Sequence, residues 1–439
     1  TAQIDMALSP DNETLVYTYS DNDKFKLKLM NINNTDGTIQ LTRSNGMPMS
    51  PCFSSDGKWV YYYEANNSET TELKKISVFG GKTETIGISN WNWGKNKGKV
   101  RITTYVDGKK EAVRLSVKDE RGHPVIPGNG MIHFEGQNGN VFFYSEGEVV
   151  LEAESGVVNI CAAKGFSVPL EHQKIRIEKD SLVEIILDLK RIWNAREQGW
   201  YCGDNHFHLN YGGIYNLDSG DIVVDLDAEE IDFAFPMVAN ISNRLINQEL
   251  FGWRKDNLPV ISFAQEVRSN FFGHIGIIGI DELYWPWAYG PSYEVYNNYD
   301  IPNQLALSFT REKGGLSSYV HPVPVKDPFT ESGIYTIPFS LVADCVQGSV
   351  DLIELACLWT DEIGTAAVWH KLLNIGIPIT ASGGSDVMNN LYHTMAIGAT
   401  RSYAKIGSNV TLENYLKALK EGRSFTSNGP MLEFIVDKC

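Results

Sequence analysis

Short apolar segments alternate with helix-like segments from about residue 193 to the end of the chain. Seven segments read as strands because they are short and nearly continuously apolar: 200–207, 231–238, 259–264, 273–280, 316–320, 350–358 and 376–382. Helical patterns ending in glycine lie between several of them, at 302–315 and 364–376 for example. Apolar strands separated by helices indicate a covered parallel sheet, so we expect an α/β fold, a closed or distorted (β/α)7 barrel, over residues 193–439.

The first 92 residues contain an internal repeat. MALSPDNETLVYTYS is echoed by CFSSDGKWVYYYEANNS, with Asp11 matching Asp56 and Tyr17 matching Tyr62 at an offset of 45 residues. Units of about 40–45 residues with short strands are typical of propeller blades, and SPCFSSDGKWVYY resembles the TolB-type repeat. We expect two blades of a partial TolB-like β-propeller over 1–92. Since two blades cannot close a ring, either further blades precede the chain or these two pack on a neighbour; an irregular β region is the alternative.

Residues 97–192 form a second β-rich segment. Its apolar residues alternate with polar ones, and Gly, Asn and Asp mark the turns, which predicts a small β-sandwich. The histidines here, His123, His133 and His172, lie in polar contexts and are predicted to be solvated. We expect this segment to be a spacer or platform, so the chain is predicted to be a multidomain protein of three domains: 1–92, 97–192 and 193–439.

Composition and charge exclude several classes of partner. The formal net charge of −16 repels phosphate backbones, so nucleic acid is not expected as a partner. No apolar run approaches the roughly 20 residues that span a bilayer, and we expect no membrane insertion. The six cysteines include no C-x-x-C pair, which excludes a cysteine zinc cluster. Because the chain begins Thr-Ala-Gln, we expect that an upstream piece was removed. The combination of domains expected for this chain favours a periplasmic or secreted location.

Metal-capable side chains gather at the ends of the predicted barrel strands. Two histidines separated by one residue point to the same side of a strand, where both imidazoles can reach one cation. The candidate ligands are His206, His208, Glu266, His274, His321 and Asp386. Because chemistry collects at the carboxyl ends of barrel strands, we expect these residues to converge. Nitrogen and oxygen ligands without sulfur suit Zn, Fe or Mn in an open catalytic site.

The same segments carry a resemblance to a known family. GDNHFHLNYGG, QEVRSNFFGHIGIIGI, SYVHPVP, GGSDVMNN and GRSFTSNGPML resemble, in order, the motifs of CehA/McbA-type metallohydrolases, a group of the PHP (polymerase and histidinol phosphatase) superfamily. The resemblance covers about 195–439. It implies that the six candidates are metal ligands, with Glu266 bridging if two ions bind.

Two departures from the PHP phosphatase pattern reduce the expected number of metal ions. Asn210-Tyr211-Gly212-Gly213 stands where such phosphatases carry an acidic turn, and Asp386 is followed by Val387 and Met388 rather than by a D-x-H motif. Both changes remove ligands of a third ion. We therefore expect one or two divalent ions, and phosphoester chemistry is less favoured.

Several residues near the ligands are candidates for supporting roles. A metal held there would acidify water and polarise a substrate carbonyl or phosphoryl group, which makes hydrolysis the expected reaction. The candidate catalytic residues are Asp386, Tyr211, Arg268 and His393; for Arg268 and His393 a packing role is the alternative. Asp204 could orient one histidine, and Glu354 is expected either to support the ligands or to pair with a cation. Trp285, Trp287, Tyr289 and Tyr293 could line a substrate pocket or only cover the barrel mouth.

Three functions remain open from the sequence. The first is a metal-dependent hydrolase that acts on an ester, carbamate or amide bond of a small-molecule substrate. The second is a phosphoesterase, which needs several cations around its anion; only Arg268 and Arg401 lie near the motifs. The third is a non-catalytic binding or surface protein that uses the propeller and the sandwich. The sequence does not define the oligomeric state.

Overall fold

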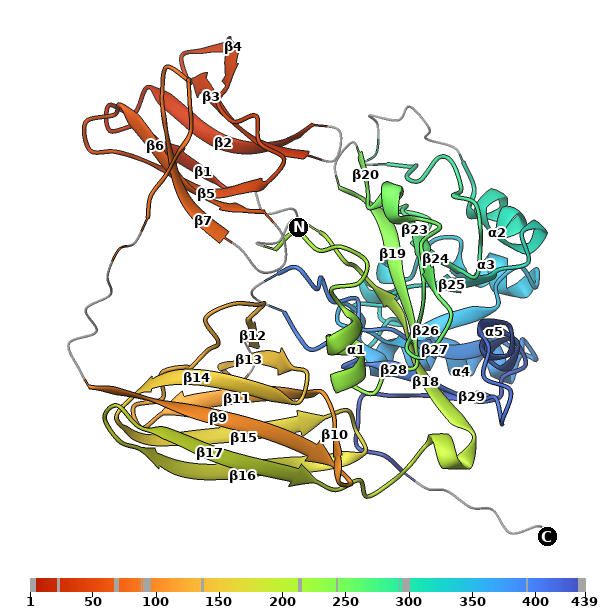
Figure 1. Cartoon of the computed structure of the whole chain (residues 1–439). Coiled ribbons are helices and arrows are strands. Elements are labelled where there is room, and N and C mark those ends of the chain that lie inside the picture. Colours follow the sequence, from red (N-terminus) through yellow and green to blue (C-terminus); the bar gives the residue numbers. More distant parts are fainter. Residues whose placement is uncertain are drawn as a thin grey trace.

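The protein is mostly β, with few helices (Figure 1). The computed structural model describes residues 5–21, 24–66, 71–87, 89, 96–135, 138–211, 215–241, 244–291, 293, 301–391 and 394–432. Within these ranges, no helix has the length and apolar character needed to cross a bilayer.

The amino-terminal repeat folds into two similar antiparallel sheets of four strands each. One sheet contains β1 (Met6–Leu8), β2 (Thr14–Asp21), β3 (Lys24–Asn31) and β4 (Asn34–Gln40), and the other β5 (Met47–Phe53), β6 (Trp59–Ala65), β7 (Thr71–Ser77) and β8 (Glu84–Thr85), each in chain order. The repeated turns share one hydrogen-bond pattern, because Asp11 accepts from the Ser9 hydroxyl and Asp56 from the Ser54 hydroxyl. The two units are therefore structural repeats as well as sequence repeats.

Residues 97–189 form two sheets around one apolar core. The first contains β9 (Lys97–Val106), β10 (Lys109–Lys110), β14 (Glu148–Glu154) and β17 (Leu182–Leu189). The second contains β11 (Val113–Asp119), β12 (His133–Glu135), β13 (Asn140–Ser145), β15 (Gly156–Lys164) and β16 (Val168–Ile177). Side chains of both sheets, such as Ile102 and Leu115, are fully buried in the shared core. These two sheets are called the sandwich below.

A sheet of 12 strands carries the remainder of the chain. It contains β18 (Trp200–Phe207), β19 (Phe233–Ile241), β20 (Arg244–Ile246), β21 (Arg254–Lys255), β22 (Val260–Ser262), β23 (Ala264–Val267), β24 (Ile275–Ile278), β25 (Leu316–Tyr319), β26 (Leu352–Ala356), β27 (Thr380–Gly383), β28 (Arg401–Lys405) and β29 (Ser424–Ser427). The α-helices of the described chain are α1 (Val223–Ala228), α2 (Asn303–Glu312), α3 (Leu341–Val346), α4 (Glu362–Asn374) and α5 (Leu412–Lys420). Each of the seven predicted strand segments contains a strand, and both predicted helical segments contain a helix.

The strand directions do not follow the expected parallel pattern. β24 runs antiparallel to both β23 and β25, and β28 runs antiparallel to β18. The connection between β23 and β24 spans only residues 268–274, and a parallel crossover needs a dozen residues or more. The structure therefore shows a mixed sheet and does not show the (β/α)7 barrel.

The large sheet nevertheless curls until its two ends meet. β27 lies at one end of the strand order and β18 and β28 lie towards the other. Asn205 on β18 donates to the hydroxyls of Ser382 (3.0 Å) and Ser402 (3.1 Å). Among the described residues no strand pairing joins β27 to β18 or β28, and backbone hydrogen bonds form only beyond β27, where the amide of Asp386 donates to the carbonyl of His206. This curvature brings the ends of β18, β23, β25 and β27 around one point.

Candidate metal centre

His206 and His208 lie at the end of β18 with both side chains buried. The Nδ1 atom of His206 lies 3.1 Å from the Glu354 carboxylate, and the Nδ1 atom of His208 lies 3.1 Å from the carbonyl oxygen of Met237. Because a carbonyl oxygen only accepts, Nδ1 of His208 carries a proton, which leaves Nε2 as the ring nitrogen that faces Asp386. Neither Nε2 atom has a hydrogen-bond partner in the described part of the chain.

Asp386 completes a group of three with these histidines. Its Oδ1 atom lies 3.3 Å from Nε2 of His206 and 3.1 Å from Nε2 of His208. Two atoms that bind one zinc ion tetrahedrally at about 2.1 Å lie about 3.4 Å apart. The spacing and the unpartnered nitrogens therefore fit a shared divalent cation.

Glu266, on β23, lies between this group and the other two predicted ligands. Its carboxylate is 2.7 Å from Nδ1 of His274, 3.4 Å from Nε2 of His321 and 3.5 Å from Nε2 of His208. His206, Glu266 and His321 form a second group whose ligand atoms lie within 4.8 Å of one another. The structure thus brings all six predicted ligands together, and Glu266 faces histidines of both groups.

Two of the six candidate ligands have backbone conformations that are uncommon for residues other than glycine. The φ angle is +32° at His321 and +49° at Asp386. Such conformations persist where the surrounding structure holds them, and they concentrate at functional sites. Here the His321 amide donates to Glu354 (2.7 Å), and the Asp386 amide donates to the carbonyl of His206 (2.6 Å).

The carboxylates of this site favour positive charge beside them. Burial lowers the pKa of His206, but Asp386 and Glu354 outweigh burial and raise it to about 10. Burial raises the pKa of Asp386, while His206 and His208 lower it to about 2. The pKa of Glu266 is held well below its usual range against its burial, chiefly by Arg268 and His274. The carboxylates are therefore ionised, as metal ligands must be.

Arg268 and Tyr211 form a polar pair beside Glu266. Nη2 of Arg268 lies 2.8 Å from the Glu266 carboxylate, and Nη1 donates to the Tyr211 hydroxyl. Burial raises the pKa of Tyr211, so the phenol keeps its proton at neutral pH. His393, the remaining candidate catalytic residue, lies outside the described residues.

Glu354 belongs to the hydrogen-bonded support of the ligands. It contacts His206 and accepts from the backbone of His321, which corresponds to the first of its two predicted roles. The Cys357 thiol lies within the same group and 3.9 Å from Asp386. Sequence reasoning missed Cys357, although its position three residues after Glu354 was a usable signal.

The structure gives Asp204 and Arg401 other partners than the sequence suggested. Asp204 does not orient an imidazole; it accepts from the backbone of Ser385 (2.9 Å) and of Gly398 (2.8 Å), because its side chain turns toward the loop that carries Asp386. Arg401 is fully buried, and its guanidinium bonds to the carbonyls of Gly398 and Glu229 instead of facing an anion site.

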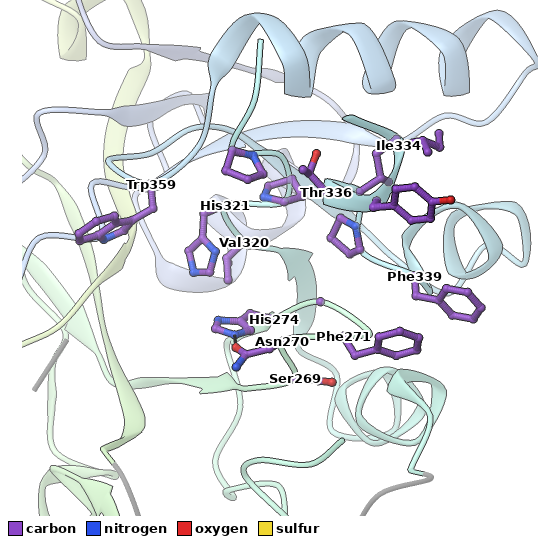
Figure 2. A pocket seen from close by; sticks show the side chains of 16 residues that line it. Ser269, Asn270, Phe271, His274, Val320, His321, Ile334, Thr336, Phe339 and Trp359 are labelled. Atoms are coloured by element: carbon purple, nitrogen blue, oxygen red, sulfur yellow. Dashed lines mark hydrogen bonds between the residues drawn. The ribbon is translucent and has the colours of Figure 1, made fainter. Parts of the chain in front are cut away.

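A cleft of about 420 Å³ opens beside His274 and His321. Figure 2 shows both imidazoles among aromatic and aliphatic side chains. Phe271 and Phe339 stack on each other with ring centroids 4.8 Å apart, and Trp359 is half exposed at the cleft. Lys, Arg, Asp and Glu are absent from the described residues that line it.

The predicted aromatic pocket residues do not line this cleft. Tyr289 is fully buried in the core, where its hydroxyl donates to Asn303 (2.6 Å). Trp285 and Trp287 pack edge to face at 4.2 Å, and Trp287 lies against the core beneath β18. The Tyr293 hydroxyl lies 3.5 Å from Asn270 at the margin of the cleft. Tyr289 is therefore a core residue, whereas Trp285 is 60% exposed.

Comparisons with known proteins give only weak similarity. No family model and no curated protein matches the chain. A two-domain protein from Bacteroides vulgatus, described as containing a predicted PHP-like metal-dependent phosphoesterase, is 15% identical over 52% of this chain and 64% of its own, with a TM-score of 0.33. TolB of Agrobacterium tumefaciens is 14% identical over 40% of this chain and 51% of its own (TM-score 0.18), and TolB of Acinetobacter baumannii 15% identical over 40% and 41% (TM-score 0.19). The chain thus spans less than two thirds of the length of each.

Proposed function

We propose that this protein is a metal-dependent hydrolase of the CehA/McbA type within the PHP superfamily. The main support is that the Nε2 atoms of His206 and His208 are buried, make no hydrogen bond in the described chain and both face Asp386. Leaving two buried nitrogens unpaired costs free energy, which a shared cation would recover. In this proposal the ligands are His206, His208, Glu266, His274, His321 and Asp386. They hold one or two ions of Zn, Fe or Mn, with Glu266 bridging if there are two.

The protein side chains have distinct roles in the proposed reaction. A divalent ion, when bound, would supply Lewis acidity and would lower the pKa of the water bound to it toward 7. Glu354 holds the ring of His206 through Nδ1, which fixes the tautomer that presents Nε2. Arg268 balances the charge of buried Glu266 and donates to the Tyr211 oxygen. The hydroxyl proton of Tyr211 is then the candidate donor to the oxygen on which charge develops.

The cleft favours an uncharged ester, carbamate or amide over a phosphoester. A phosphoryl group needs several cations around its oxygens. The described lining contains aromatic, aliphatic and proline residues, polar side chains such as Asn270 and Thr336, and two histidines, but no Lys or Arg. The nearest guanidinium, Arg268, is already paired with Glu266. We further propose a small-molecule substrate and a division into domains at 1–92, 97–192 and 193–439.

The test is metal content combined with a substrate panel. The purified chain is analysed for Zn, Fe and Mn and assayed on chromogenic carboxyl esters, carbamates, amides and phosphoesters, with and without chelator. We expect about one or two equivalents of metal and chelator-sensitive hydrolysis of a carbon-centred substrate that His206→Ala abolishes. Hydrolysis of phosphoesters alone would support the phosphoesterase. Absence of both metal and activity would support a binding protein.

A further inference from the structure

The sandwich touches the segment that carries Asp386 through the short strand β12. The Nδ1 atom of His133 lies 2.9 Å from the carbonyl oxygen of Leu391, and the amide of Thr394 donates to the carbonyl of Phe134 (3.2 Å). One residue earlier, the amide of Ile132 donates to the hydroxyl of Tyr215, which donates back to the carbonyl of Ile132, both at 2.9 Å. We name His133, Ile132 and Tyr215 the β12 contact.

From the β12 contact, hydrogen bonds continue into the metal centre. The side chain of Asn390 donates to the carbonyl of Tyr215 (3.0 Å) and accepts from the amide of Tyr211 (2.9 Å). The amide of Asn389 donates to the carbonyl of His208 (2.9 Å), and His208 donates to the carbonyl of Val387 (2.8 Å). Segment 386–391 is therefore bonded to β18 on one side and to the sandwich on the other.

His133 is an unusual residue for the apolar place that it occupies. It is 1% exposed, with its ring among Phe142, Tyr144 and Tyr215. Because the Leu391 carbonyl only accepts, Nδ1 carries the proton, and Nε2 is left buried without a hydrogen-bond partner in the described chain. An unpaired buried nitrogen costs free energy that a leucine would avoid. Compared with leucine, the imidazole of His133 gains one interaction, the hydrogen bond from Nδ1 to the carbonyl of Leu391.

A second contact joins the sandwich to the large sheet without a direct bond to that segment. Arg114 on β11 lies 3.1 Å from Glu229, which follows α1, and the hydroxyl of Tyr144 donates to the same carboxylate at 3.2 Å. Among the described residues, Tyr144 makes no hydrogen bond to residues 386–391. This contact therefore provides a matched control at the same interface.

We infer that the β12 contact positions segment 386–391, and with it Asp386 and Tyr211, so that the sandwich is a working part of the metal centre and not a spacer. His133 and Tyr215 are positioning residues, since each acts through the backbone of another element. The expected effect on metal binding rests on the proposed function. The expected effect on the backbone dynamics of residues 386–391 rests only on the hydrogen bonds.

The test compares full-length variants by hydrogen–deuterium exchange of segment 386–391 and by Co²⁺ titration followed through the d–d absorption bands. His133→Leu and Tyr215→Phe remove the contact, His133→Asn retains a donor near the position of Nδ1, and Tyr144→Phe is the control. We expect exchange in 386–391 to quicken about 5-fold or more and Co²⁺ binding to weaken by a similar factor in the first two variants. His133→Asn and the control should stay near wild type.

Unchanged exchange of 386–391 in both His133→Leu and Tyr215→Phe would overturn the positioning role, as would an equal change in Tyr144→Phe. If His133→Leu does not fold, the isosteric Tyr215→Phe still decides the question. Failure of the wild-type chain to bind Co²⁺ is a separate result, which would overturn the proposed metal function. The hydrogen–deuterium exchange of residues 386–391 would still test the role of the β12 contact.

Discussion

His133 is predicted to make the free energy of unfolding depend on pH. Burial lowers the pKa of its imidazole from 6.5 to about 4, and the bond to Leu391 offsets only part of that effect. The other titratable groups facing the ring are the phenols of Tyr144 and Tyr215, which are neutral in this range. Between these two pKa values the unfolded chain binds a proton that the folded chain excludes.

The sign and size of the effect follow from this difference. Stability rises with pH wherever the unfolded state binds more protons, so the contribution of neutral His133 is fully present above about pH 6.5 and is lost as the pH falls towards about 4. A difference of about 2.5 pKa units corresponds to about 3 kcal/mol. His133→Asn cannot titrate in this range and keeps a donor for Leu391.

The measurement is urea unfolding of wild type and His133→Asn at several values between about pH 7 and pH 4. Other ionisable groups act equally in both proteins, so the difference between their unfolding free energies isolates His133. We expect this difference to shift against the wild type by about 3 kcal/mol across the range. A difference that stays constant with pH would show that His133 is not a buried neutral imidazole, and the reasoning would be refuted.

Three further predictions concern the metal centre and its cleft. Glu354→Gln weakens the hold on the His206 ring and should reduce metal affinity about 10–100-fold, measured by competition with a chromogenic chelator; unchanged affinity would contradict the support role. Arg268→Met leaves Glu266 buried without its cation and should destabilise the metal-free chain by about 3–5 kcal/mol in urea unfolding, less when metal is added; equal losses with and without metal would argue against a cation beside Glu266. Trp359→Ala should change KM for substrates without changing metal content, and loss of metal would place Trp359 in the ligand support instead.

The candidate ligands could be identified from the sequence because their signals are local. His206 and His208 are two residues apart on one strand, and Glu266, His321 and Asp386 each follow a short apolar run. The seven strand segments were found for the same reason: continuous apolarity reports burial on both faces. The direction of the strands was not predicted. β24 runs antiparallel to β23 because the short connection 268–274 folds back on β23, and hydrophobic pattern does not report strand direction.

Roles that depend on distant partners escaped sequence reasoning. His133 was expected in solvent from its polar neighbours, but a carbonyl 258 residues away and the ring of Tyr215 bury it. Asp204 shares a strand face with the two histidines, yet it bonds to the backbone of Ser385. Tyr289 occurs in a loop rich in Pro and Gly but belongs to the core.

By itself the sequence indicated which side chains are candidate ligands in this protein and which segments are strands, because residue type and hydrophobic period are properties of neighbours along the chain. Only the tertiary structure decided that Glu266 stands between two groups of histidines, that Glu354 fixes the ring of His206, and that the sandwich reaches the segment holding Asp386. The physical reason is that these relations are set by curvature of a mixed sheet and by packing between segments far apart in the chain, and local pattern contains neither.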